Sequence, residues 1–188
     1  MNKAIFLDRD GTINVEKNYL YKIEDFEFMP GVVDALKQLQ QAGYLLIIVT
    51  NQSGIARGYY TEKDFQKLND WMVTQLKMQD VIIDQVYFCP HLPNAEVEKY
   101  RKDCNCRKPK LGLYQQAIAD YKIELKKSYA IGDKIRDCAI CEQTLCKGFL
   151  VGDNEKPDII DKVKDGAYDR VSYANSLADA ANMILQMV

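Results

Sequence analysis

The chain of 188 residues contains a single histidine, and its charges nearly cancel, giving a net charge of −2 at neutral pH. With so little imidazole available, acid–base chemistry falls first to carboxylates. The small negative charge argues against a general binder of nucleic acid or of acidic membranes, because both kinds of binding require a strongly basic surface.

Long apolar runs are also missing. The longest, such as residues 44–49, fall far short of the roughly 20 apolar residues that span a bilayer. No charged segment followed by an apolar one opens the chain, since Asp8 arrives too early, so we expect a cytoplasmic protein. In that compartment the six cysteines are better interpreted as thiols or metal ligands than as disulfides.

No repeat, low-complexity tract or long linker divides the chain, and its length predicts a single domain, residues 1–188. Short apolar runs typical of buried strands occupy residues 3–7, 44–49, 84–88, 129–131 and 148–151, with a last short strand expected at 168–171. Apolar residues at helical spacing predict helices over 32–39, 61–76, 113–118, 138–141 and 177–185, which lie between these strands and after the last one, with none between 148–151 and 168–171. This alternation predicts an α/β fold with a doubly wound, Rossmann-like parallel sheet.

Polar residues stand at or soon after the ends of these strands. Five of them follow a strand directly, namely Asp8, Asp10, Thr50, Asn51 and Asp133, and Lys108 lies in the loop after the third strand. In open α/β sheets ligands bind outside the carboxyl ends of the strands, so we expect these groups to line one crevice. Contributions from four separate strand ends favour a functional site over turn residues that happen to be polar.

The first strand leads into Asp8-Arg9-Asp10-Gly11-Thr12. Side chains at i and i+2 of an extended segment point the same way, so Asp8 and Asp10 are expected to converge at the strand end. Two carboxylates held that close repel each other and invite a hard cation such as Mg²⁺. Taken alone, these residues also fit a strand-end turn, which often contains Asp.

Phosphoryl transfer gives each of these groups a task. Asp8 is placed to attack phosphorus, and Asp10 to protonate the leaving oxygen and later to deprotonate the attacking water. Mg²⁺ bound by Asp8 and Asp133 would offset the negative charge of nucleophile and phosphate. Lys108 and the hydroxyl of Thr50 would hold the equatorial oxygens, where the charge of the transferred group resides.

In these stretches the chain resembles the haloacid dehalogenase-like phosphatases. Four segments are similar to the family's four motifs, in the same order: Asp8-Arg9-Asp10-Gly11-Thr12, Thr50-Asn51, Lys108 and Gly132-Asp133-Lys134-Ile135-Arg136-Asp137. The resemblance implies that Asp8 is the nucleophile and Asp10 the general acid/base. It also implies three Mg²⁺ ligands, namely Asp8, Asp133 and the backbone carbonyl of Asp10. Asp137 is then either a supporting carboxylate or only an acid in the first turn of a helix.

A second metal site is predicted in a loop of residues 89–106, which begins with Cys89-Pro90-His91 and ends with Cys104-Asn105-Cys106. Ligands at i and i+2 can share one side of an extended segment, so Cys89, His91, Cys104 and Cys106 can close a tetrahedral Zn²⁺ site. The spacing is unusual, and a loop with stray thiols is the alternative. The only histidine lies in one pair, however, and three of the six cysteines lie in this loop, which favours zinc.

The zinc is expected to be structural. Cys106 directly precedes Arg107 and Lys108, so fixing Cys106 on a metal would fix both cations without any chemistry at the metal itself. A further C-x-x-C pattern, Cys138 to Cys141, lies on an apolar helical segment with no second pair nearby, and we expect it to be buried in the core.

Some twenty residues between Asp10 and Gly31 are too few for the inserted cap domain that most family members carry. The resemblance therefore implies a capless haloacid dehalogenase-like core with a zinc-binding loop. Two capless groups with zinc fit, the heptose bisphosphate phosphatases and the histidinol-phosphate phosphatases. Residues 50–58, TNQSGIARG, resemble the first group and imply removal of the 7-phosphate of D-glycero-D-manno-heptose 1,7-bisphosphate. The product would be heptose 1-phosphate, for nucleotide-activated heptose.

The substrate contacts implied by this resemblance are Glu16, Lys17, Asn18, Tyr19, Thr50, Asn51, Gln52, Ser53, Arg107, Lys108 and Lys134. Arg57 adds a cation, which a bisphosphate needs more than a monophosphate does. We therefore expect a small sugar bisphosphate as the partner, no nucleic acid or membrane, and a monomer.

Alternatives of other kinds remain open. A zinc-dependent nucleic-acid module would use the cations that cluster around the second cysteine pair, although the acidic net charge argues against it. A polynucleotide-end phosphatase would also fit an open site. A phosphoacceptor signalling receiver fits poorly, because it needs an aspartate where the third strand has Phe88-Cys89-Pro90.

Overall fold

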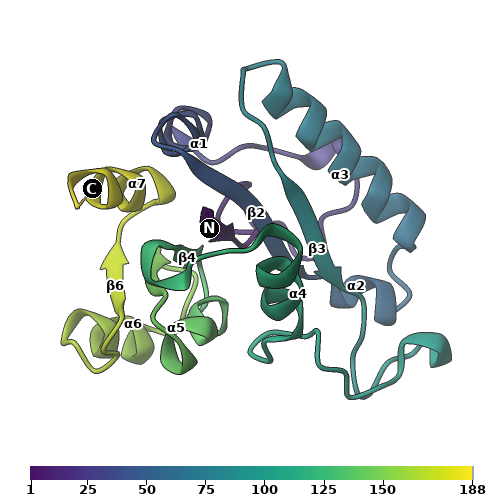
Figure 1. Ribbon diagram of the computed structural model, residues 1–188. Coiled ribbons are helices and arrows are strands. Elements are labelled where there is room, and N and C mark those ends of the chain that lie inside the picture. The colour runs from purple at the N-terminus through teal and green to yellow at the C-terminus, as the bar shows by residue number, and fades with distance from the viewer. Residues whose placement is uncertain (188) are drawn as a thin grey trace.

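A computed structural model, which describes residues 1–187, contains one sheet of six parallel strands (Figure 1). The strands are β1 (Lys3–Leu7), β2 (Tyr44–Asn51), β3 (Gln85–Cys89), β4 (Tyr129–Gly132), β5 (Lys147–Val151) and β6 (Val171–Ala174). Their order in the sheet is β3-β2-β1-β4-β5-β6. The chain starts in the middle and winds outward in both directions, which confirms the predicted doubly wound fold.

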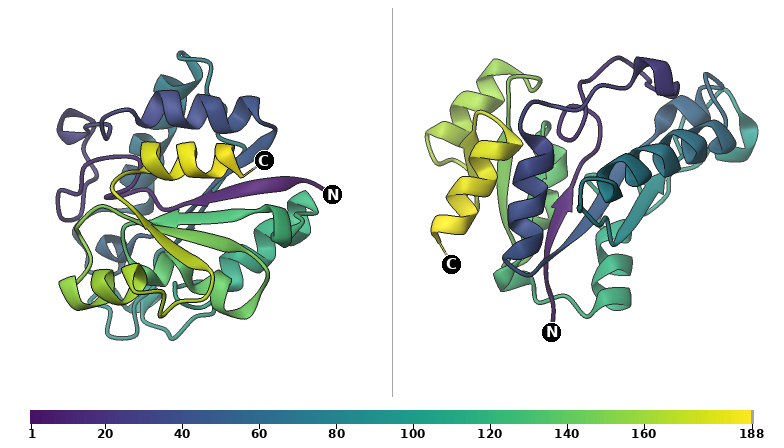
Figure 2. Two further views of the ribbon diagram at one scale, coloured as in Figure 1. Left: turned by 90° about the vertical axis from the view of Figure 1, so that its left-hand side faces the viewer. Right: turned by 90° about the horizontal axis from the view of Figure 1, so that it is seen from above.

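Helices cover both faces of the sheet (Figure 2). The α-helices are α1 (Val32–Gln41), α2 (Ser53–Ala56), α3 (Glu62–Lys77), α4 (Gly112–Tyr121), α5 (Ala139–Gln143), α6 (Pro157–Lys164) and α7 (Leu177–Gln186). The 3-10 helices are η1 (Ile23–Asp25), η2 (Glu98–Tyr100), η3 (Leu125–Lys127) and η4 (Ile135–Cys138). Within residues 1–187, no helix has the length and apolar character needed to cross a membrane.

Alternate residues of the central strands enter two cores on opposite faces. Ile5 and Leu7 of β1 pack in the core that α1, α3 and α7 cover, whereas Ala4 and Phe6 pack in the core under α4, α5 and α6. Because successive side chains of a strand point to opposite faces, a strand buried on both sides needs apolar residues throughout. This explains why the central strands stand out in the sequence as unbroken apolar runs.

A third, smaller cluster of buried side chains joins α2 and the start of α3 to the loop of residues 89–106. Its members are Ile55, Ala56, Tyr60, Phe65, Ala95 and Tyr100. The connection from β1 to α1 contains, within residues 1–187, only η1 as a helical element. This agrees with a core that has no inserted cap domain. In this connection Phe26 and Phe28 pack edge to face, with ring centroids 4.8 Å apart, against the core under α1.

The last strand was predicted at residues 168–171, but β6 begins three residues later, at Val171. The carbonyl of Tyr168 accepts a hydrogen bond from the backbone N–H of Val171 at 3.1 Å, which closes a turn where the strand was expected. Val171 is the first residue that pairs with β5, opposite Gly148. Three further differences concern helices. The predicted helix through Cys138 starts as η4 before α5 follows, and neither α2 nor α6 has a counterpart among the predicted elements.

Helix α3 starts at a capping box formed by Thr61 and Asp64, as its sequence indicates. The backbone N–H of Asp64 donates to Oγ1 of Thr61 at 3.1 Å, and the backbone N–H of Thr61 donates to Oδ2 of Asp64 at 2.8 Å. Two N–H groups that a helix start would leave without partners are thereby bonded. The box fixes the point at which the chain leaves the loop that carries Arg57.

Replacing Thr61 with Ala should therefore lower the free energy of unfolding by about 1 kcal/mol, because the first turn of α3 loses its side-chain cap. Urea unfolding followed by circular dichroism measures this difference. Thr61→Ser keeps the hydroxyl and should retain most of the stability. An alanine variant as stable as the wild type would show that the box contributes nothing.

Candidate active site

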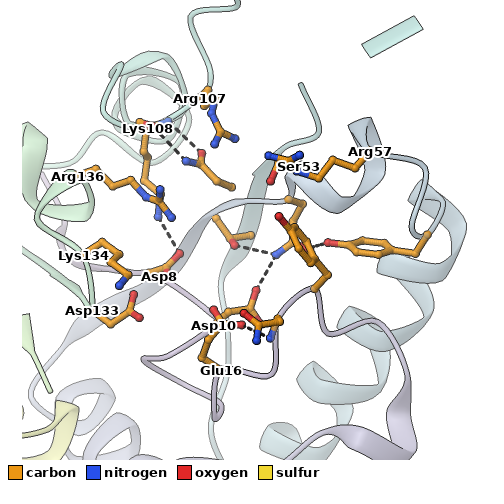
Figure 3. A pocket seen from close by; sticks show the side chains of 16 residues that line it. Asp8, Asp10, Glu16, Ser53, Arg57, Arg107, Lys108, Asp133, Lys134 and Arg136 are labelled. Carbon is orange, nitrogen blue, oxygen red and sulfur yellow. Dashed lines mark hydrogen bonds and ion pairs between the residues drawn. The ribbon is translucent and has the colours of Figure 1, made fainter. Parts of the chain in front are cut away.

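The residues that follow β1, β2 and β4 surround a cavity of about 340 Å³ (Figure 3). It opens at the carboxyl ends of the strands, beside the point between β1 and β4 where the winding of the sheet reverses, the usual ligand site of doubly wound sheets. Fourteen of the predicted site residues line it: Asp8, Asp10, Glu16, Asn18, Tyr19, Thr50, Asn51, Gln52, Ser53, Arg57, Arg107, Lys108, Asp133 and Lys134. The structure thus brings together side chains that the sequence separates by more than a hundred positions.

Lys17 is the predicted contact that does not line the cavity. Its ammonium lies 3.4 Å from the carboxylate of Glu27, so its role toward a substrate stays a prediction. Two lining residues, Tyr60 and Arg136, were missed by the sequence reasoning. Nothing in the sequence around Tyr60 marks it, whereas Arg136 stands two positions after Lys134 in the fourth motif, a signal that was available.

Lys108 lies between two carboxylates in the wall of the cavity. Its buried ammonium donates to Oδ1 of Asp8 at 2.8 Å and to the carbonyl of Val49 at 2.6 Å, and it lies 2.7 Å from Oδ1 of Asp137. Burial by itself would lower the pKa of the ammonium, but Asp137 and Asp8 raise the pKa of Lys108 above its ordinary value. The lysine is therefore a fixed positive charge next to the candidate nucleophile.

Asp137 is a buried carboxylate that helps to hold Lys108 in place. It is only 2% exposed, and its Oδ2 accepts a hydrogen bond from the backbone N–H of Lys134 at 3.0 Å. With its other oxygen on Lys108, the carboxylate links η4 to the loop after the cysteine cluster. Of the two interpretations left open by the sequence, the contacts favour a supporting carboxylate over a mere first-turn acid.

Asn51 directs its side chain at the backbone of Lys108. Its Nδ2 donates to the carbonyl of Lys108 at 3.1 Å, and its Oδ1 accepts from the N–H of Lys108 at 3.0 Å. Both polar groups of the amide are thereby engaged, and the end of β2 is tied to the loop that carries the lysine. Although Asn51 lines the cavity, its side chain positions Lys108.

The carboxylate of Asp10 has its own set of partners at the other side of the cavity. Arg9 donates to it at 3.0–3.2 Å, and the side-chain amides of Asn14 and Gln52 each donate at 3.0 Å. The two aspartates that follow β1 thus face the same cavity while their carboxylates contact different groups (Figure 3). The carboxylate of Asp10 is held in place on the cavity wall by three residues.

Three carboxylates, those of Asp8, Asp133 and Asp137, have oxygens within 4.8 Å of one another. Burial, followed by the charges of the neighbouring carboxylates, raises the pKa of Asp8 to about 7 and the pKa of Asp133 to about 8. Carboxylate oxygens are the ligands that Mg²⁺ prefers, and a dication removes the repulsion that shifts these pKa values. The donor set and its surplus of negative charge therefore fit Mg²⁺.

Two glycines make room for this carboxylate cluster. A Cβ atom on Gly11 would lie 2.1 Å from Oδ2 of Asp133, and one on Gly132 would lie 2.2 Å from Cβ of Asp137. Gly11 also has a φ of 83°, which other residues rarely adopt. The side-chain amide of Asn154 donates to Oδ2 of Asp133 at 3.1 Å and orients that carboxylate.

The four predicted zinc ligands converge as expected. The Sγ atoms of Cys89, Cys104 and Cys106 lie 3.0–3.5 Å from one another, and Nδ1 of His91 lies 3.2 Å from Sγ of Cys106. Ligands around a tetrahedral Zn²⁺ with Zn–S bonds near 2.3 Å are about 3.8 Å apart, so a small expansion accommodates the ion. Three thiols and one imidazole fit a closed structural zinc site.

The cysteine cluster and the cavity share one stretch of chain. Cys106 is followed directly by Arg107 and by Lys108, which reaches Asp8. Nη1 of Arg107 lies 3.5 Å from the carbonyl of His91, so the arginine also contacts the loop of the cluster. This continuity supports the prediction that zinc fixes the two cations. The other three cysteines, at positions 138, 141 and 146, are buried in the core under α4, α5 and α6.

Three guanidinium groups, from Arg57, Arg107 and Arg136, line the cavity. Within residues 1–187, no carboxylate lies within 4.0 Å of any of them. Burial lowers the pKa of Arg107, and the positive charges of Arg136 and Arg57 lower it further. The rim of the cavity thus has an excess of positive charge, which favours an anionic ligand.

Comparison with known proteins identifies close relatives. Residues 3–158 match the family described as polynucleotide kinase 3 phosphatase. The chain is 52% identical over 141 residues, 74% of this chain and 77% of the relative, to the D-glycero-β-D-manno-heptose-1,7-bisphosphate 7-phosphatase of Haemophilus ducreyi. It is 42% identical over 184 residues, 98% of this chain and 97% of the relative, to the enzyme of the same name from Pasteurella multocida.

A solved structure shows the same fold over the whole chain. The D,D-heptose 1,7-bisphosphate phosphatase of B. bronchiseptica, complexed with magnesium and phosphate, superimposes with a TM-score of 0.82 and 29% sequence identity. The match covers 99% of both chains.

Replacing Cys106 with Ser should reduce the zinc content below the expected level of about one ion per chain and lower the rate of phosphate ester hydrolysis. The reason is that Arg107 and Lys108 would no longer be fixed by the metal. Zinc is measured by atomic emission and hydrolysis by phosphate release.

Cys146→Ala removes a buried thiol outside the cluster and serves as the control, with unchanged zinc content. Undiminished turnover in zinc-depleted protein would contradict the positioning role of the metal.

Proposed function

Because the chain belongs to the haloacid dehalogenase-like phosphatases, and within them to the family of the D-glycero-β-D-manno-heptose-1,7-bisphosphate 7-phosphatases, we propose that it removes the 7-phosphate of this β-configured heptose bisphosphate. The products are inorganic phosphate and heptose 1-phosphate, the precursor for nucleotide activation of the sugar. The observation that carries the proposal is the contact of Lys108 with Asp8 beside Asp133 and Asp137, a charge arrangement suited to phosphoryl transfer.

In the first step a carboxylate oxygen of Asp8 attacks phosphorus, and the bond between phosphorus and the sugar 7-oxygen breaks. Asp10 donates a proton to the departing oxygen, so the heptose leaves as an alcohol and an aspartyl phosphate remains. In the second step Asp10 takes a proton from a water molecule that attacks the same phosphorus. Inorganic phosphate departs and the carboxylate of Asp8 is restored.

The hydrogen bonds around Thr50 suit a phosphate-binding hydroxyl. Its Oγ1 accepts a hydrogen bond from Nε2 of Gln52 at 3.0 Å, and Oε1 of Gln52 in turn accepts from the hydroxyl of Tyr60 at 2.5 Å. Since the oxygen of Thr50 is already an acceptor, its own proton is free to donate to a phosphate oxygen. The ammonium of Lys108, which donates to the carbonyl of Val49 next to Thr50 and to Asp8, stabilises the charge on the transferred group.

Asp8, Asp133 and the backbone carbonyl of Asp10 would hold Mg²⁺, with Asp137 beside them. Bound there, the ion would act as a Lewis acid that offsets the negative charge of the phosphate. The related structure that contains magnesium and phosphate supports this assignment.

We extend the proposal to a monomeric, cytoplasmic enzyme. In support of that location, none of the six cysteines forms a disulfide, which fits a reducing compartment.

Asp8→Asn should lower phosphate release from D-glycero-β-D-manno-heptose 1,7-bisphosphate by about 10³-fold or more, because the nucleophile is lost. Phosphate release gives the rate, and ³¹P nuclear magnetic resonance identifies which phosphate remains on the sugar. Asp161→Asn, a matched change on the exposed face of α6, should leave the rate unchanged.

The same assay extends to a panel that contains the α anomer, histidinol phosphate and a 3′-phosphorylated oligonucleotide. Release of the anomeric phosphate, or faster turnover of histidinol phosphate or of the oligonucleotide, would overturn the proposed function.

A further inference from the structure

Arg136 has no task in the reaction described above. It belongs to η4, three residues after Asp133, and its exposed side chain lines the cavity. In the described part of the chain it forms no ion pair within 4.0 Å and donates no hydrogen bond. A guanidinium that lines a cavity and has no partner in its own chain is available to bind an anion.

The other two guanidiniums of the cavity are in a similar state. The Nε atom of Arg57 is buried without a hydrogen-bond partner, and the guanidinium carbon lies 5.9 Å from the ring centroid of Tyr19. Arg107 reaches only the carbonyl of His91, at the outer limit of hydrogen bonding, 3.5 Å. Three like charges that face one space repel one another, and an anion placed between them relieves that repulsion.

These three arginines come from three different elements. Arg57 follows α2, Arg107 follows the cysteine cluster, and Arg136 lies in η4 (Figure 3). Arg136 is exposed and Arg57 and Arg107 are partly exposed, whereas Lys108 is buried at the carboxylate cluster. The cations of the cavity are thus divided between its interior and its rim.

The division corresponds to the charges of a doubly phosphorylated sugar. Each phosphate monoester carries about −1.5 to −2 charges at neutral pH. In the interior Lys108 would meet the reacting phosphate, and the carboxylate cluster would hold the metal that offsets its charge. A second phosphate on a distant carbon of the sugar would reach the rim, where planar guanidinium groups match its oxygens in charge and geometry.

We propose that Arg136 is a specificity-determining residue, which joins Arg57 and Arg107 in binding the second phosphate and selects doubly over singly phosphorylated sugars. The inference deepens the proposed function and rests on it. Residues 132–137 then carry both the carboxylates of the cluster and a cation that recognises the substrate.

The test compares two substrates that share the reacting group, D-glycero-β-D-manno-heptose 1,7-bisphosphate and heptose 7-phosphate. In Arg136→Gln the ratio of kcat/KM for the bisphosphate to kcat/KM for the monophosphate should fall roughly 10- to 100-fold, as loss of a hydrogen bond to a charged group predicts. Most of the fall should appear in KM. Arg136→Lys keeps the charge and should recover part of the ratio.

Arg170→Gln removes the same charge from an exposed position between α6 and β6, outside the cavity, and should leave the ratio unchanged. A wild-type ratio in Arg136→Gln would overturn the inference. An equal loss for both substrates would also overturn it, because Arg136 would then act on the reacting phosphate or on the fold.

Failure of the proposed function gives a different result, because it appears in the wild-type protein, which would then release the anomeric phosphate, prefer another substrate of the panel or hydrolyse neither heptose ester. In that case calorimetric binding of fructose 1,6-bisphosphate and fructose 6-phosphate to the wild type and to Arg136→Gln decides the role of Arg136. A selective loss of affinity for the bisphosphate supports the inference, and equal affinities in the two proteins contradict it.

Discussion

One ammonium group between two carboxylates holds the candidate active site together. Lys108 contacts Asp8 at 2.8 Å and Asp137 at 2.7 Å, and these three residues come from the end of β1, the loop after the cysteine cluster and η4. Without the lysine, two carboxylates would lie close together with little access to water, a costly arrangement. The loop that carries Lys108 must therefore be brought firmly to the sheet edge. Asn51 on one side and the cysteine cluster on the other both serve this end.

The sequence predicts best what depends on burial and on local hydrogen bonds. Both ends of strand β1 were predicted correctly. Its residues are apolar on both faces of the sheet, so the apolar run in the sequence ends where the strand ends. The edge strand β6 was misplaced, since an apolar Tyr168 begins the turn before it and the strand itself is only partly buried. The carboxylates of the cavity could be predicted because they stand directly after β1 and β4, whereas Lys108, about twenty positions after β3, was found only through the resemblance of its motif.

The partners of each site residue could not be derived in the same way. The i, i+2 rule applies to extended chain, but β1 ends at Leu7 and the backbone turns at Gly11, so Asp8 and Asp10 find different partners. The side-chain amide of Asn51 donates to the backbone of Lys108, a residue 57 positions away. This contact depends on tertiary structure that no local pattern encodes. Tyr60 was missed for the same reason: its hydroxyl reaches the site only because α2 packs beneath it.

The strand order has a consequence for biosynthesis on the ribosome. Strand β1 precedes the other five strands of the sheet along the chain and occupies its middle. Its second neighbour β4 pairs Ile5 with Tyr129, 124 positions later. Contacts of such high sequence separation form slowly and late. Lys108, Asp133 and Asp137 also emerge well after Asp8, so an unfinished nascent chain presents an isolated aspartate and cannot act on cellular phosphate esters. Catalytic competence thus requires synthesis of the chain to beyond Asp137.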